Sequence, residues 1–288
     1  MAGVFKEIFA TIILSLFYPD ASWLKELTSM DHMVDNNAIN LAECGADPEV
    51  VENNATWPLT PAQRTDSGII IPLATFDTKP THVTNVESIE TNYEKAKSVT
   101  QQHINTLYKR ACTSAAYNLA PAEHASNTPV IKTTGAVNTN GVRALTYNDI
   151  TDLSLAFDNG DLPQDGRILL LSPQHKKDLK NENIKLYKQM MTDKEIDGFK
   201  VYTFTGNPKY DPTDGSKLPY GSATGNDSSV AFVKTAAMRA MGTIEGEPEK
   251  RWSDYRGWLL GFQLRFVALP FRTYGYGAIY SDAAPAEG

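Results

Sequence analysis

The sequence predicts an α+β fold in which some elements bury their apolar residues outside their own chain. Three features predict it: a series of short β segments over 38–84, a 33-residue run without Gly or Pro over 87–119, and a mixed helix and strand block over 143–245. A returning β segment follows over 258–280. We therefore expect a discontinuous domain with a second domain inserted into it.

Composition and charge set the first limits on function. The chain has 288 residues, of which 41% are hydrophobic, enough to bury a sizeable core. The formal net charge of −7 disfavours a protein that grips nucleic acid, because such proteins concentrate Lys and Arg in patches. Cys44 and Cys112 lie too far apart to indicate a disulfide framework, and we expect both to be inert thiols.

The N-terminal apolar run Ile8 to Tyr18 is too short to span a bilayer. A signal peptide is the alternative, although no small-residue cleavage pattern follows Tyr18. We favour an amphipathic helix. Its apolar residues nearly encircle it, so we expect it to dock on another subunit or on the rest of the fold.

The β segments over 38–84 read as an extended hairpin. A short alternating run over 38–42 precedes turn-rich sequence over 44–61, and further β segments follow around Ile69 to Ile71 and Thr75 to Lys79. A long two-stranded hairpin is at best marginally stable alone. Its partner is therefore expected outside the monomer.

The Gly- and Pro-free run predicts one long helix. Its periodic series includes Val99, His103, Leu107, Ala111 and Ala115, at the spacing of one helical face. At a rise of about 1.5 Å per residue, the helix would be about 50 Å long. We expect it to lie across a domain, with the returning β segment beside it.

The block over 143–245 alternates helices and strands. Thr146 and Asp149 have the spacing of a capping box at the start of a helix, and Ser172 with Pro173 has that of an N-cap and first-turn proline. Helices are predicted over 147–157, 174–180 and 234–241, strands over 167–171, 199–204 and 230–233, and a long loop over 207–226.

No catalytic, cofactor-binding or metal-binding motif is present. The sequence has no phosphate-binding loop, no HExxH and no GxSxG pattern, and its histidines are scattered. His103 falls on the apolar face of the long helix, where a structural role is expected. The loop Asp211 to Gly215 fails the ligand alternation of a calcium site. The aromatic residues Trp252, Tyr255, Trp258 and Phe262 are expected to pack in the core or in an interface rather than to bind a sugar.

Several stretches resemble the Hong Kong 97-type major capsid proteins of tailed phages. INLAECGADPEVVENN over 39–54, an IIIPL-type strand and FDTKPTHVT resemble the extended-loop region of capsid proteins from Bacteroidetes phages. LTYNDI over 145–150, RILLLSP over 167–173 and DGFKVY over 197–202 resemble the axial domain. The stretches SVAFVKTAAMRAMG over 229–242 and RFVALPFRTYGYGAIYS over 265–281 resemble later segments. The order of these stretches carries the resemblance, since each alone is only a packing pattern.

The resemblance implies a domain plan. It places an N-terminal arm over 1–36, an extended loop over 37–85, a peripheral domain over 86–142 and 246–288 with its spine helix over 87–119, and an axial domain over 143–245. It implies no cofactor and no catalytic residue. Cross-linking through isopeptide bonds is not expected, because the central loop offers only Arg64, with Lys79 near its base.

The implied function is a structural subunit of a virion, not an enzyme. Hexamers and pentamers would close into an icosahedral shell around double-stranded DNA, held by loose contacts, and assembly would occur in the host bacterial cytoplasm without a membrane. A separate scaffold protein, a portal and decoration proteins are the implied partners. Alternatives are an encapsulin-like compartment and, more remotely, a secreted carbohydrate-binding protein or hydrolase. The residues expected at subunit interfaces are Ile8, Ile12, Leu16, Trp57, Ile69 and Ile71, and the loop over 207–226 is expected near a symmetry axis.

Overall fold

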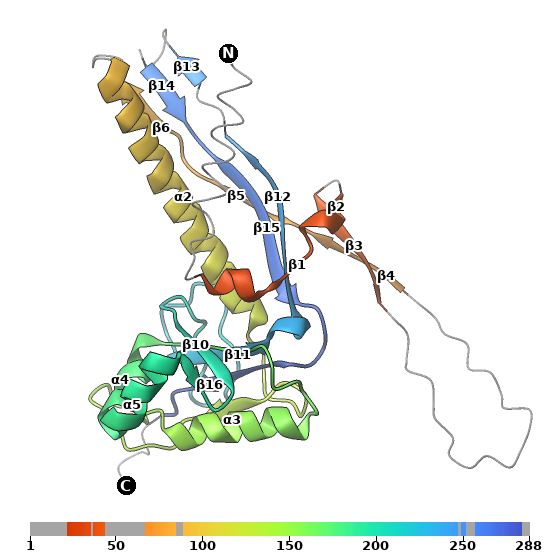
Figure 1. Ribbon diagram of the computed structural model, residues 1–288, viewed down its shortest axis with the longest axis vertical. Helices are drawn as coiled ribbons and strands as arrows, with labels where there is room; N and C mark the ends of the chain where they lie inside the picture. The colour runs from red at the N-terminus through yellow and green to blue at the C-terminus, as the bar shows by residue number, and fades with distance from the viewer. Residues whose placement is uncertain are drawn as a thin grey trace, which may run out of the picture.

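The computed structural model describes residues 22–35, 37–43, 67–84, 89–246, 249–251 and 257–283. A long layer and a compact block meet at the C-terminal half of helix α2 (Figure 1). The helices are η1 (Trp23–Glu26), η2 (Asp31–Met33), α2 (Ile89–Leu119), α3 (Tyr147–Asn159), α4 (Pro173–Glu182), α5 (Ile184–Asp193) and η3 (Lys234–Ala236). The strands are β1 (Thr28–Ser29), β2 (Val34–Asp35), β3 (Ala38–Glu43), β4 (Ser67–Pro72), β5 (Ala74–Asp77), β6 (Thr81–Thr84), β7 (Val130–Lys132), β8 (Arg167–Leu171), β9 (Glu195–Ile196), β10 (Phe199–Thr203), β11 (Ser228–Val233), β12 (Ala237–Glu245), β13 (Glu249–Arg251), β14 (Gly257–Leu260), β15 (Gln263–Pro270) and β16 (Tyr276–Tyr280).

The long layer is built from α2 and two sheets. The sheets have the strand orders β1-β12-β15-β5 and β13-β14-β6, and β15 packs along α2. The helical face predicted from sequence is the buried one, with Leu107, Ala111 and Ala115 almost fully buried. Ile104 and Cys112 widen this face. The long helix is thus confirmed, and so is the position of β15 beside it. The end of the returning segment, β16, instead joins the sheet of the compact block.

The compact block is a sheet with helices on one face and α2 on the other. Its strand order is β7-β16-β11-β8-β10-β9. Alternation along β8 divides the core: Ile168 and Leu170 belong to the cluster that contains α2, whereas Leu169 and Leu171 pack with α3 and α4. One strand therefore joins the two parts of the molecule.

Local sequence signals fix the helix starts of this block. Asp149 accepts a 2.8 Å hydrogen bond from the Thr146 amide, and the Thr146 hydroxyl accepts one from the Asp149 amide, which confirms the capping box. Ser172 caps α4 by accepting from the His175 amide. The sequence reading missed α5, which begins where the Asn183 side chain accepts from two backbone amides.

The prediction of a helix over 234–241 is wrong beyond the first turn. Only η3 is helical, and the chain continues as β12, which pairs with β15 on one side and β1 on the other. Ala and Met favour helices, but hydrogen bonding on both edges together with burial of Met238 and Ala240 outweighs that preference.

The hairpin expected over 38–84 is shorter than predicted. Of the four strands in this span, only β3 and β4 pair with each other, in a register that sets Glu43 opposite Ser67, and β2 pairs with the other edge of β3. β5 pairs with β15 and β6 with β14, so the chain returns to the long layer after Leu73. The sheet pairing also departs from the domain boundaries expected at 143 and 245. β7 and β16, which lie outside those boundaries, join the sheet of the block, and β12, which lies inside them, joins the long layer.

Among the described residues, no helix combines the length and hydropathy needed to cross a bilayer.

Candidate assembly surfaces

The hairpin of β3 and β4 projects from the long layer (Figure 1). Its base is held by its own chain: Ile39 is fully buried, and Ile71 packs in part against the cluster that contains Ile39, Met238 and Val267. Ile70 is 70% exposed. The hairpin therefore presents a large apolar side chain to solvent beyond a base that the monomer stabilises.

The six interface residues predicted from sequence fall in different places. Ile8, Ile12, Leu16 and Trp57 lie outside the described residues. Ile69 is in β4 opposite Leu41, and Ile71 contributes to its own chain's core. The sequence reading missed Ile70, although the alternation of a strand sets it on the face opposite Ile71.

Residues 22–35 form a strap that crosses both parts of the molecule. Trp23 packs edge-on to Phe204 at 5.7 Å and beside Phe232 at 6.0 Å between ring centroids. Further along, β1 pairs in parallel with β12. The arm predicted over 1–36 thus includes a segment that is integral to this chain's core.

An ion pair joins the strap to the compact block. The Lys200 ammonium lies 2.5 Å from Glu26 Oε1, which also accepts a 2.8 Å hydrogen bond from the Tyr202 hydroxyl. The hydrogen bond from Lys200 holds the pKa of Glu26 below its usual value, and the same bond raises the pKa of Lys200. This contact fixes η1 against β10.

A groove of about 610 Å³ runs between β5 and α2. Phe76 and Leu107 supply apolar surface, and Asp77, Lys79 and Arg110 supply charge. β5 is an edge strand, so its outer backbone groups have no strand partner among the described residues. The groove can accept an extended chain that carries an apolar side chain.

The loop over 207–226 is anchored on the C-terminal end of α2. The Lys217 ammonium donates to the carbonyls of Tyr117 and Ala120 at 3.0 and 2.6 Å, and the Tyr210 hydroxyl donates to the Pro121 carbonyl at 2.6 Å. Burial lowers the pKa of Lys217. A cation at a helix C-terminus complements the orphan carbonyls and the helix dipole.

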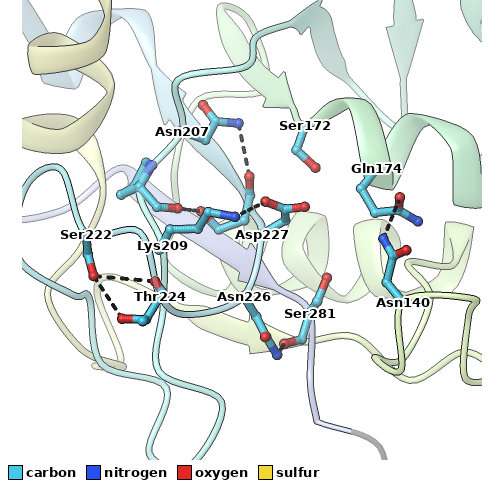
Figure 2. A network of polar contacts seen from close by, with 12 residues as sticks. Asn140, Ser172, Gln174, Asn207, Lys209, Ser222, Thr224, Asn226, Asp227 and Ser281 are labelled. Atoms are coloured by element: carbon cyan, nitrogen blue, oxygen red, sulfur yellow. Dashed lines mark hydrogen bonds and ion pairs between the residues drawn. The ribbon is translucent and has the colours of Figure 1, made fainter.

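Figure 2 shows the polar contacts that hold the two ends of this loop. The Lys209 ammonium pairs with Asp227 (Figure 2). Asn207 donates to the carbonyls of Leu170 and Ser228 at 2.8 and 3.0 Å. Asn226 donates to the Ser281 carbonyl at 2.7 Å. These bonds hold the two ends of the loop against the sheet of the compact block.

His175 lies at the centre of a buried polar cluster. Its Nδ1 is 2.7 Å from Ser229 Oγ, its Nε2 is 2.9 Å from Ser281 Oγ, and its side chain is fully buried. Ser229 Oγ also accepts from the Ser172 amide. Burial lowers the pKa of His175 to about 4, so the imidazole is neutral at pH 7.

The remaining residues singled out in the sequence, His103, the cysteines and the aromatic residues, are not part of a reactive or metal-binding site in the described part of the chain. His103 is 2.9 Å from Thr81 Oγ1 and packs beside Phe262, which is itself buried, so the expected structural histidine is confirmed. Burial raises the pKa of Cys112 to about 12, which makes it an unreactive thiol. Cys44, Trp252 and Tyr255 lie outside the described residues. No group of three or more His, Cys, Asp or Glu in the described ranges is arranged to hold a metal ion.

Sequence comparison gives no relative: no family model matches the chain, and no curated protein matches it either.

Structural comparison finds solved structures that are similar over most of the chain. The capsid of the cyanophage P-SCSP1u superposes with a TM-score of 0.62 at 15% identity, covering 88% of this chain and 86% of that one. The capsid of Ralstonia phage GP4 gives 0.61 at 7% identity, covering 91% and 88%. A virus-like particle from Pyrococcus furiosus gives 0.58 at 11% identity, covering 95% and 98%. The narrower resemblance to Bacteroidetes phages is not addressed by these structures. The chain has the Hong Kong 97-type fold of tailed-phage capsid proteins.

Proposed function

We propose that this protein is a major capsid protein whose hexamers and pentamers close into an icosahedral shell around double-stranded DNA. The observation that carries the proposal is a capsid fold with a projecting hairpin that exposes Ile70. Ile70 is 70% exposed on a narrow projection and is not buried by any described part of its own chain, so contact with a neighbouring copy would bury it. The role is that of a structural subunit rather than an enzyme.

The groove between β5 and α2 is the proposed receptor for the hairpin of a neighbouring copy. The hairpin projects on the side of the molecule opposite α2 (Figure 1), so one repeated rotation can place each hairpin on the next copy. Such head-to-tail contacts generate closed rings when the rotation between neighbours closes. The open edge of β5 supplies backbone groups, and the partly buried Phe76 supplies apolar contact.

The proposal keeps the domain plan in its main lines. Residues 1–36 are the arm with an embedded strap, 37–85 the extended loop, and 87–119 the spine helix of the peripheral domain (86–142 and 246–288). The axial domain is the block expected over 143–245, but with β7 and β16 added to its sheet and with β12 assigned to the long layer. Proposed partners are a separate scaffold protein, a portal, decoration proteins and DNA in loose contact. The location is the virion after assembly in the host cytoplasm. Ile8, Ile12, Leu16, Trp57 and Ile69 remain proposed interface residues.

An encapsulin-like shell is the second candidate, since the archaeal particle shares the fold. Its TM-score of 0.58 does not exceed the 0.62 of the cyanophage capsid. We therefore retain the capsid assignment. Mass spectrometry and nucleic-acid staining of particles purified from the native source would separate the two, because a capsid encloses DNA and a compartment encloses a cargo enzyme.

Shortening the hairpin tests the proposal. Glu43 and Ser67 are opposite each other, so an Asn-Gly turn can replace residues 44–66 without changing the register of β3 and β4. The shortened protein should keep the thermal midpoint of the intact chain and fail to form shells in electron micrographs. Normal shells from this variant would refute the role of the hairpin. The variant Asp35→Asn, an exposed change at its base, is the matched control.

A further inference from the structure

The compact block exposes apolar side chains at α5. Ile184 is 54% and Met191 45% exposed, and they are seven positions apart, so they lie on one stripe of the helix with Lys188 between them. Lys188 forms no ion pair with any residue that the structure describes. This α5 stripe is an apolar surface with a positive charge at its centre.

The turn over 271–275, between β15 and β16, carries a second apolar surface. Phe271 is 43% and Tyr274 36% exposed. The Phe271 amide donates to the Ala236 carbonyl at 2.7 Å, which fixes the turn on η3. The Arg272 guanidinium lies over the Tyr274 ring, 5.4 Å from its centroid. The turn is therefore held in place while its two large side chains face solvent.

The two surfaces lie at opposite ends of the block. The amide of Tyr147, at the start of α3, donates to Glu182 at the junction of α4 and α5. The other end of α3 leads into the turn over 160–166, where Leu162 packs near Gly275. Thirteen residues of helix separate these ends by about 20 Å. Figure 1 shows α5 on one side of the block and the turn after β15 on the other.

Negative charge accompanies the second surface. Asp161 and Asp165 lie in the turn over 160–166 and form no ion pair within the described part of the chain. Lys234 also lies at this end, beside Gly166. Arg167 makes the acidic turn rigid, because its buried guanidinium donates to Asp158 and to the Leu162 carbonyl at 2.6 and 2.9 Å.

We propose that the α5 stripe of one copy packs on the 271–275 turn of a second copy, with Lys188 facing the acidic turn beside it. This contact rests on the proposed ring-forming function, and it would lie near the centre of the ring. The 271–275 turn lies on the same side of the molecule as the hairpin, and α5 on the same side as α2 (Figure 1). In this proposal one rotation between neighbours brings both pairs of surfaces together, as a heterologous ring requires.

Charge insertion tests the contact. Met191→Glu and Phe271→Lys each place a charge on one surface, and both positions are exposed, so the monomer should keep its circular dichroism and thermal midpoint. Each variant should reduce the fraction of protein that sediments as shells by about tenfold, since desolvated unpaired charge at an interface is strongly unfavourable. The double variant sets a carboxylate on one surface against an ammonium on the other and should recover shells at least in part.

Two control variants introduce the same charged groups as the test variants, but away from the proposed contact. Gln189→Glu adds the same charge on the opposite face of α5, and Leu155→Lys replaces an exposed apolar residue of α3. Both should assemble like the unchanged protein. If the unchanged protein forms shells and the Met191 variant does too, or if the double variant recovers none, the contact is overturned. If the unchanged protein forms no shells, the proposed function itself fails.

Discussion

At the scale of single residues, the buried side chain of His175 links α4 to the sheet of the compact block. It bridges Ser229 of β11 and Ser281, just after β16, and both of its ring nitrogens are engaged. A neutral imidazole supplies one donor and one acceptor, which two hydroxyl groups can satisfy. A protonated ring would place an unsolvated charge in this cluster.

The stability of the fold should therefore depend on pH through His175. Its pKa is lowered from 6.5 to about 4, so the unfolded chain binds the proton first as the pH falls. The stabilisation is complete above pH 6.5, decreases between pH 6.5 and 4, and amounts to about 3 kcal/mol in total. Urea unfolding of dissociated subunits at several pH values measures it. His175→Gln should lower stability at pH 7 and flatten the slope in this window; an unchanged slope would contradict the assignment.

Asp149 is a second residue whose replacement should lower the free energy of unfolding. It closes the capping box of α3 and also accepts a 2.6 Å hydrogen bond from the Thr134 hydroxyl. Asp149→Asn converts an acceptor into a partial donor facing these donors and should destabilise the protein by about 1 to 3 kcal/mol. Asp152→Asn, one turn away and exposed, should change stability little. Chemical denaturation of both variants gives the comparison, and equal midpoints would contradict the proposed cost.

The strap over 22–35 is the element that joins the two parts of the chain. Trp23 contacts Phe204 after β10 and Phe232 in β11, and its neighbour Ser22 accepts a 2.7 Å hydrogen bond from Tyr108 on α2. Trp23→Ala should cost about 3 to 5 kcal/mol, because it removes a large side chain from a packed site. Met33→Ala, at a 43% exposed position of the same strap, is the control. A small effect of the Trp23 change in thermal unfolding would show that the strap is dispensable.

Elements with strong local signals were predictable from sequence, and those set by distant pairing were not. The α2 face and the caps at Thr146 and Ser172 follow from spacing and short-range hydrogen bonds. β12 could not be predicted, because its two partners come from the strap and from a segment that follows later in the chain. Ile70 was missed for a similar reason: only the pairing of β4 and the burial of Ile71 decide which isoleucine faces solvent.

At the scale of the whole molecule, three surfaces in the described part of the chain leave large apolar side chains exposed. Ile70 on the hairpin, the α5 stripe and the turn over 271–275 all expose apolar side chains, whereas the base of the hairpin and the strap are satisfied internally. Ile70→Asp should therefore leave the unfolding midpoint of the monomer unchanged and reduce shell yield. Ile71→Asp, which enters the chain's own cluster, should lower the midpoint instead. Equal effects of the two changes on stability would contradict this division.

Assembly of the purified full-length protein, followed by electron microscopy at increasing protein concentration with and without its scaffold, tests the central claim most directly. The account predicts closed shells of uniform diameter built from rings of five and six subunits. Protein that stays monomeric, or that forms only open or irregular aggregates under all these conditions, would contradict it.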